Sequence, residues 1–297
     1  MNTPEESAFQ EPFDGNLAKT FGPSSSPDRA GVDPDNPPWG LFQAILLCIT
    51  SVFLLIIVPG ISALIYVATQ YRGMPLSQDV LFNDRTYIAI MVASILPAHL
   101  LTILLALALS SRLGKLSPFR TLGFSWPENF RLGKSVALAV FLFIVAMGLL
   151  YFFGGPDTEL ERILRSSRVA ALLMAFLATV TAPLMEEIVY RGLLYSALQR
   201  WTGALAAVAL VTLIFAALHV WQYWPNFGAI SAIFLLSLVL TSVRARTGRL
   251  LPSYVIHLVF NGIQSVIIVA DPYLRTIVET PKPEAAPAFI HMLIRAL

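Results

Sequence analysis

Seven long runs of apolar residues divide this chain, and they constrain its fold more than any other feature. The runs cover residues 41–71, 87–111, 135–154, 169–199, 204–222, 228–243 and 250–270. A helix of about 20 residues crosses the hydrocarbon core of a bilayer. Inside lipid, every backbone N–H and C=O needs a partner within the protein, so runs of this length are expected to be helical. The sequence predicts an all-α, polytopic transmembrane helix bundle of about 7–8 membrane helices, the eighth depending on residues 288–297.

The composition supports a chain that is solvated mainly by lipid. Hydrophobic residues make up 56% of it and charged residues only 13%, whereas a soluble domain carries about 25% charged residues. The formal net charge of +2 is too small to suggest a nucleic-acid partner. The expected surroundings are therefore a lipid bilayer.

The sequence predicts two parts of unequal size. Residues 1–38 are rich in acids, proline, serine and glycine without helical or strand periodicity, which predicts a disordered N-terminal tail. Residues 39–297 form the predicted transmembrane domain, in which 157–168 is amphipathic and predicts a surface helix. Loop Lys and Arg number 11 on the side of the N-terminus and 8 on the other side. This bias predicts a multi-pass protein of the cell (inner) membrane with a cytoplasmic N-terminus.

Within the seven predicted spans, the only charged residues are Glu186, Glu187 and Arg191. Each costs about 2.5–3.5 kcal/mol near the bilayer centre, so their retention in one segment suggests a functional site. Glu187 and Arg191 are four residues apart and are expected to pair on one helix face. Glu186 is turned by about 100° and lacks that neighbour, which makes it a candidate general base. Pro183 is expected to kink this long run.

Two histidines on other runs complete a possible catalytic set. His219 follows Phe215 by four residues, and His257 precedes Asn261 by four residues, so each pair shares one helix face. Together with Glu186 they supply a base, two imidazoles and an amide donor, which are the groups needed to add water to a carbonyl. His99 has no acid nearby in the sequence and is predicted to be structural.

These motifs resemble a known family. The set Glu-Glu-x-x-x-Arg at 186–191, Phe-x-x-x-His at 215–219 and His-x-x-x-Asn at 257–261 is similar to that of CPBP (Abi) family intramembrane proteases. This family includes CAAX prenyl proteases and bacteriocin-processing or self-immunity enzymes. The resemblance covers residues 169–265 and implies a CAAX-protease-like intramembrane endopeptidase. It implies that Glu186, His219 and His257 are catalytic, that Asn261 stabilises the oxyanion, and that Glu187 and Arg191 are supporting residues.

The resemblance further implies a peptide or membrane-protein substrate, lipidated or membrane-associated, without choosing among such substrates. The alternatives are a non-enzymatic membrane scaffold or immunity protein, a proton-coupled transporter, or a zinc-dependent version of the protease. The transporter reading is disfavoured because the charges are confined to one run. Zinc would be held by Glu186, His219 and His257, but Glu186 would then be both ligand and base. We therefore expect no metal cofactor.

Overall fold

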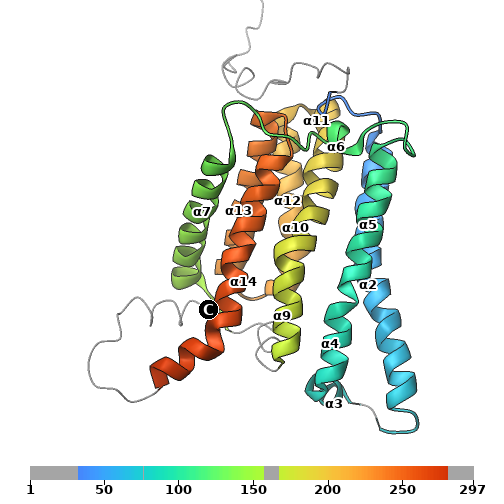
Figure 1. Ribbon diagram of the computed structural model, residues 1–297, viewed down its shortest axis with the longest axis vertical. Coiled ribbons are helices and arrows are strands. Elements are labelled where there is room, and N and C mark those ends of the chain that lie inside the picture. The colour runs from blue at the N-terminus through green and yellow to red at the C-terminus, as the bar shows by residue number, and fades with distance from the viewer. Residues whose placement is uncertain (1–32, 76, 157–166, 280–297) are drawn as a thin grey trace, which may run out of the picture.

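The computed structural model describes residues 33–75, 77–156 and 167–279, with side chains through residue 270. The described residues form helices and no strand (Figure 1). The helices are α2 (Leu41–Gln70), α3 (Gln78–Asn83), α4 (Arg85–Ala93), α5 (Ile95–Ser110), α6 (Pro118–Thr121), α7 (Leu132–Phe153), α9 (Arg168–Phe176), the π-helix η1 (Leu177–Thr181), α10 (Ala182–Glu186), the π-helix η2 (Glu187–Leu194), α11 (Tyr195–Thr202), α12 (Ala204–Tyr223), α13 (Phe227–Thr247) and α14 (Leu251–Glu279).

Seven helical spans in the described residues are long and apolar enough to cross a membrane, which confirms the predicted fold class. The second span, Arg85–Ser110, is divided between α4 and α5 at Ser94. Pro97 explains this break because it has no N–H to donate to the preceding turn. The sixth span, predicted as 228–243, extends over Phe227–Thr247. It includes Arg244, whose side chain is fully buried. With the bounds that the structure gives, the spans also include Arg85, Lys134, Arg168, Arg200, Arg244 and Arg246, of which only Arg244 is buried, so the three residues expected from the sequence are not the only charges within them.

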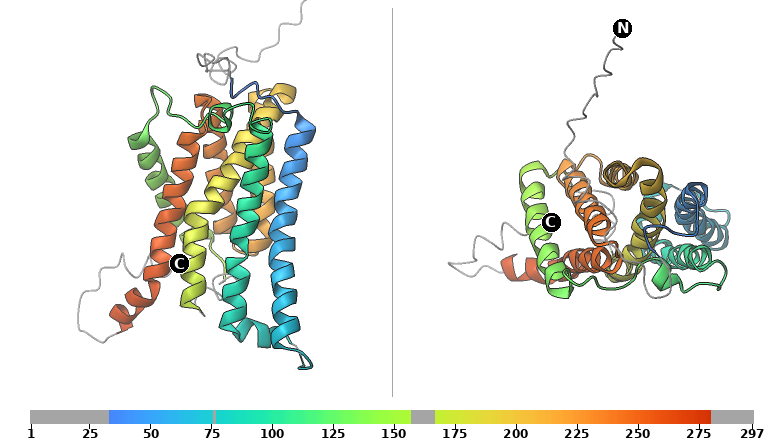
Figure 2. Two further views of the ribbon diagram at one scale, coloured as in Figure 1. Left: turned by 45° about the vertical axis from the view of Figure 1, so that its right-hand side comes forward. Right: turned by 90° about the horizontal axis from the view of Figure 1, so that it is seen from above.

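The fourth span is the central element of the bundle and runs as one helical path from Arg168 to Thr202. It passes through η1 immediately before α10 and through η2 immediately after it. The fourth span lies between α5 and α14 in both side views (Figure 1 and the left view of Figure 2). Wide π-turns, which are frequent at functional sites, therefore flank the short helix that ends at Glu186.

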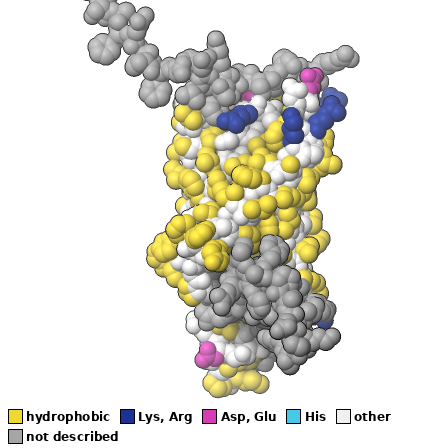
Figure 3. Space-filling model, turned by 90° about the vertical axis from the view of Figure 1, so that its left-hand side faces the viewer, with side chains coloured by type: hydrophobic (Ala, Val, Ile, Leu, Met, Phe, Trp, Pro, Cys, Tyr) yellow, Lys and Arg dark blue, Asp and Glu magenta, His cyan; other side chains and the backbone are white. Residues whose placement is uncertain are grey.

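Packing distinguishes the interior of the bundle from its outer surface. One buried cluster joins α2, η2, α11 and α12, and a second joins α7, α13 and α14. Gly228 lets α13 approach α7 closely, since a Cβ there would lie 2.7 Å from the Leu149 carbonyl oxygen. Large apolar side chains such as Phe42 and Phe152 face outward, and hydrophobic side chains cover much of the face shown in Figure 3. This distribution is what lipid requires of the exterior.

The segment 33–40, here called the N-terminal strap, crosses the end of the bundle that carries α6 and α11. The carboxylate of Asp35 lies 2.7 Å from Nη1 of Arg244. The buried indole of Trp39 donates to the Leu193 carbonyl at 3.1 Å, and the guanidinium of Arg200 donates to the Trp39 carbonyl. Residues 33–38 were expected to belong to the disordered tail, and they instead contact the bundle because the fully buried Arg244 needs partners there.

Three other expectations lie outside the described residues. They concern the remainder of the predicted tail (1–32), most of the predicted surface helix (157–166) and the C-terminal segment (280–297).

Candidate active site

The fourth span presents the two adjacent acids in different surroundings. Glu186 is the last residue of α10, and its side chain is 16% exposed. Glu187 begins η2, where all eight residues are buried, and its side chain is fully buried. A carboxylate that retains some exposure can reach water, whereas a fully buried one needs cationic or hydrogen-bonding partners.

His257 of α14 lies between these two acids. Its Nδ1 is 3.0 Å from Oε1 of Glu187, and its Nε2 is 3.6 Å from Oε2 of Glu186. An ionised carboxylate can only accept hydrogen bonds, so Glu187 fixes the tautomer in which Nδ1 carries a proton. The second nitrogen then faces Glu186. The imidazole of His257 therefore connects the Glu-Glu-x-x-x-Arg motif of the fourth span with the His-x-x-x-Asn motif of α14.

Arg191 anchors this arrangement from the other side of Glu187. Its Nη1 lies 3.1 Å from Oε1 of Glu187, the pairing that the spacing predicts. Nη2 donates to Oγ of Ser237 at 2.9 Å and Nε to Oγ1 of Thr241 at 3.3 Å, and the guanidinium lies 4.3 Å from the centre of the Phe215 ring. The fully buried cation is thus held by an anion, two hydroxyl groups and an aromatic face, which fixes the carboxylate that orients His257.

His219 joins the site through Phe215 rather than directly. Its ring centroid is 4.6 Å from that of Phe215, and the Phe215 ring is 6.2 Å from the ring of His257. Nδ1 of His219 is 2.8 Å from the Phe215 carbonyl oxygen, so this nitrogen is used within its own helix. Phe215 is therefore the common neighbour of both histidines, and the described residues show no direct contact between His219 and Glu186.

Asn261 lies one helical turn after His257 and contacts the backbone of the fourth span. Its Nδ2 donates to the Ala178 carbonyl in η1 at 2.9 Å. One turn further, Oγ of Ser265 accepts from Thr179 at 2.9 Å and donates to the Ala175 carbonyl at 3.3 Å. An amide group has two N–H donors, so one of those of Asn261 remains for another acceptor.

Sequence reasoning left His99 outside the site and did not single out Thr181, Ser237, Thr241 or Ser265. His99 is buried on α5 with Nδ1 2.8 Å from Oγ1 of Thr181, the last residue of η1. The pairs Ser237 and Thr241, and Asn261 and Ser265, each occur at a spacing of four residues within an apolar run. That spacing places two hydroxyl or amide groups on one helix face and is the signal that points to them.

The groups that would hold zinc in the alternative mechanism do not gather in the described residues. No three side chains of His, Cys, Asp or Glu come together there as a metal-binding group. Glu186 and His257 are adjacent, but His219 is held against its own helix by Nδ1 and by the Phe215 ring. The bond from Nδ1 to the backbone leaves Nε2 of His219 as the nitrogen that could meet a ligand.

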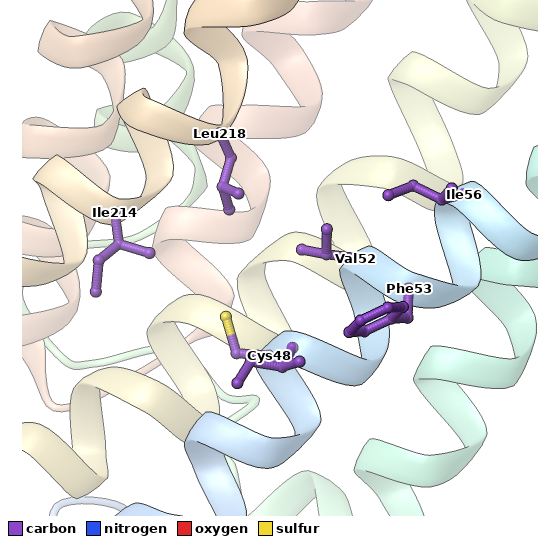
Figure 4. A pocket seen from close by; sticks show the side chains of 7 residues that line it. Cys48, Val52, Phe53, Ile56, Ile214 and Leu218 are labelled. Carbon is purple, nitrogen blue, oxygen red and sulfur yellow. The ribbon is translucent and has the colours of Figure 1, made fainter.

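An apolar pocket of about 320 Å³ lies between α2 and α12. Cys48, Val52 and Phe53 line it from α2, and Ile214 and Leu218 line it from α12 (Figure 4). Its lining is entirely apolar.

The pocket adjoins the aromatic groups of the site. Cys48 lies within hydrogen-bonding reach of the Tyr190 hydroxyl. The Tyr190 ring stands edge-on to Phe215 at 5.3 Å between centroids.

Comparison with models of known protein families gives a match. Residues 168–263 match the family described as type II CAAX prenyl endopeptidase Rce1-like, which confirms the resemblance drawn from the three motifs. No curated protein and no solved structure matches the chain. The matched region spans the helices that carry Glu186, His219, His257 and Asn261.

Proposed function

We propose that this chain, whose residues 168–263 carry the Rce1-like region of type II CAAX prenyl endopeptidases, is an intramembrane endopeptidase in which Glu186 activates water. The match implies protease activity at the level of the family. The observation that carries the assignment is the position of His257, with Nδ1 on Glu187 and Nε2 toward Glu186. Of the two acids, Glu186 is the one whose side chain keeps some exposed surface.

The proposed reaction uses each group for one task. Water gives a proton to Glu186 while its oxygen attacks the carbonyl carbon of the scissile peptide bond. The same proton is then passed to the leaving amine nitrogen as the C–N bond breaks, so one water is consumed for each bond cleaved. Glu187 and Arg191 hold His257, whose Nε2 orients the water. His219 contributes its free nitrogen at the edge of the site, and the remaining N–H of Asn261 is available for the oxyanion.

The apolar pocket supports a membrane-associated or lipidated peptide as the substrate. An apolar chain entering between α2 and α12 would contact Leu218, the residue before His219. A pocket without polar groups favours hydrocarbon over a free peptide, whose backbone needs hydrogen-bonding partners. The proposed substrate is therefore a peptide with an attached or adjacent apolar segment.

A cleavage assay in proteoliposomes tests this proposal. The probes are a fluorogenic peptide with a C-terminal farnesyl-cysteine sequence, the same peptide without the lipid, and a peptide derived from a transmembrane helix. We expect the wild-type protein to cleave at least one of the two apolar probes and Glu186→Gln to cleave neither. A folded wild-type protein without activity on any probe would instead favour a scaffold or immunity role.

We also propose that the end of the bundle carrying the N-terminal strap faces the cytoplasm. The loop Lys and Arg bias supports this orientation. Single cysteines placed at Ser125 and at Gly73, in a Cys48→Ser background, test it in intact cells. We expect a membrane-impermeant maleimide to label position 73 and not position 125, and the reverse pattern would invert the orientation.

A further inference from the structure

The π-turn η1 is held by side chains from two neighbouring helices. From α14, Asn261 donates to the Ala178 carbonyl at 2.9 Å, and Ser265 contacts Thr179 and the Ala175 carbonyl. From α5, His99 contacts Thr181 at 2.8 Å. Because the fourth span lies between α5 and α14, these contacts reach η1 from two directions (Figures 1 and 2).

The location of η1 gives these contacts a consequence for the site. Pro183, two residues after η1, has no N–H, so the helix lacks one backbone hydrogen bond at this point. Side-chain donors from neighbouring helices replace such bonds inside a membrane. Glu186 follows three residues after Pro183 on the five-residue helix α10. A change in the twist of η1 therefore turns the Glu186 carboxylate toward or away from His257.

His99 has a defined role in this arrangement. The Thr181 hydroxyl donates its only proton to the Leu177 carbonyl at 3.4 Å, so its oxygen accepts from Nδ1 of His99. The imidazole is 4% exposed. A buried imidazole with one nitrogen on the last residue of η1 is a polar group that the proposed reaction has not used.

We propose that His99 is a positioning residue for Glu186. It holds η1 from α5 through Thr181, while Asn261 and Ser265 hold it from α14, and together these contacts keep the Glu186 carboxylate facing His257. The proposal rests on the proposed function, in which Glu186 is the base. His99 itself is not assigned any contact with substrate.

Ring ¹⁵N signals of histidine test the positioning without a substrate. The full chain contains four histidines, and the signals of His257 and His219 can be assigned from the variants His257→Gln and His219→Gln. We expect His99→Ala and Thr181→Val to shift the His257 signals. The variant His99→Asn keeps a donor at the Nδ1 position and should restore them. An unchanged His257 signal in folded His99→Ala or Thr181→Val protein would overturn the proposal.

Kinetics on the farnesylated probe provide the second measurement. We expect His99→Ala and Thr181→Val each to lower kcat by up to about a hundredfold, with little change in KM, because Glu186 is misplaced. The double variant should be no worse than either single variant, since both remove the same contact. His99→Asn and Thr181→Ser should retain most activity. Additive losses, or losses confined to KM, would contradict the proposal.

Thr102→Val is the matched control on the same helix. Thr102 is fully buried on α5, but its hydroxyl donates to the Ala98 carbonyl of its own helix. This variant should leave both kcat and the His257 signals at their wild-type values, and a loss equal to that of His99→Ala would assign the effect to α5 packing and overturn the proposal. Wild-type protein that is inactive on every probe would count against the proposed function, while the ¹⁵N signals would still decide the positioning.

Discussion

Glu186 and Glu187 are neighbours in sequence, but their different surroundings predict different costs for removing each charge. Glu186→Gln keeps the side-chain size and removes the base, so kcat should fall by about 10²–10⁴ with unfolding unchanged. Glu187→Gln leaves Arg191 buried without its anion and should lower stability by about 3 kcal/mol or more. Kinetics on the farnesylated probe and thermal unfolding measure both effects.

The same experiment could show that the roles assigned to Glu186 and Glu187 must be exchanged. A Glu187→Gln protein that is well folded and fully inactive, combined with an active Glu186→Gln protein, would make Glu187 the base. Arg191→Met is the companion variant, because it removes the cation and leaves the Glu187 carboxylate buried without it.

Metal dependence is a second question at the scale of residues. Because Glu186 would have to serve as both ligand and base, and because no three candidate ligands come together in the described residues, we expect purified active protein to contain much less than one zinc per chain and to remain active after chelation. Metal analysis alongside the cleavage assay measures this. Stoichiometric zinc, with activity lost on chelation and restored by zinc, would contradict the prediction and would require His219 to approach Glu186.

Part of the candidate site was predictable from single residues. A charge within an apolar run is conspicuous, so Glu186, Glu187 and Arg191 could be found and the ion pair could be inferred from spacing. His99 could not be assigned, because its partner Thr181 lies 82 positions later and neither residue is unusual in its own run. Asn261 was expected to serve the oxyanion, but its contact with the Ala178 carbonyl depends on the shape of another helix.

At the scale of elements, the lengths of the spans were predictable and their internal geometry was not. Pro183 indicated a break in the fourth span, but no residue pattern indicated the π-helices η1 or η2. At η1, the side chains that contact the π-turn come from α5 and α14, which are distant in sequence. The end of α13 was misplaced for a related reason, since Arg244 is charged and was assigned to a loop although Asp35 pairs with it.

Asp84, the N-cap residue of α4, connects the C-terminal end of α2 with the beginning of α4. Its Oδ1 accepts from the N–H groups of Thr86 and Tyr87, and its Oδ2 accepts from the hydroxyls of Tyr66 at 2.7 Å and Tyr71 at 2.8 Å. Partial burial acts to raise the pKa of Asp84, but these hydrogen bonds outweigh it and lower the pKa. The same bond to Asp84 raises the pKa of Tyr71.

This cluster predicts a pH-dependent contribution to stability. Because the pKa of folded Asp84 lies below its unfolded value of about 3.9, its contribution is complete above that value and is lost as pH falls through the folded pKa. Asp84→Asn should therefore unfold at a lower temperature than wild type near neutral pH, with the gap closing in acid. Asp79→Asn on α3 removes the same charge nearby and should show no such gap. A gap of constant size from neutral pH to acid would rule out this linkage.

At the scale of the whole molecule, the N-terminal strap connects the beginning of the described chain to its sixth span. Asp35→Ala should lower the stability of the bundle by about 3–5 kcal/mol, because Arg244 would remain buried without its anion. Thermal unfolding in detergent measures the loss. Replacing both residues, as Asp35→Leu with Arg244→Met, should recover much of it. Equal stability of Asp35→Ala and wild type would show that water or another group compensates Arg244.

The N-terminal strap also imposes an order on assembly. Trp39 binds a carbonyl 154 positions later, and Asp35 binds a guanidinium 209 positions later. During synthesis, α2 enters the bilayer long before the ribosome has made α13, so the residues before α2 remain without partners for most of translation. Protection of these residues from an added protease therefore reports the arrival of the sixth span and not the insertion of the first.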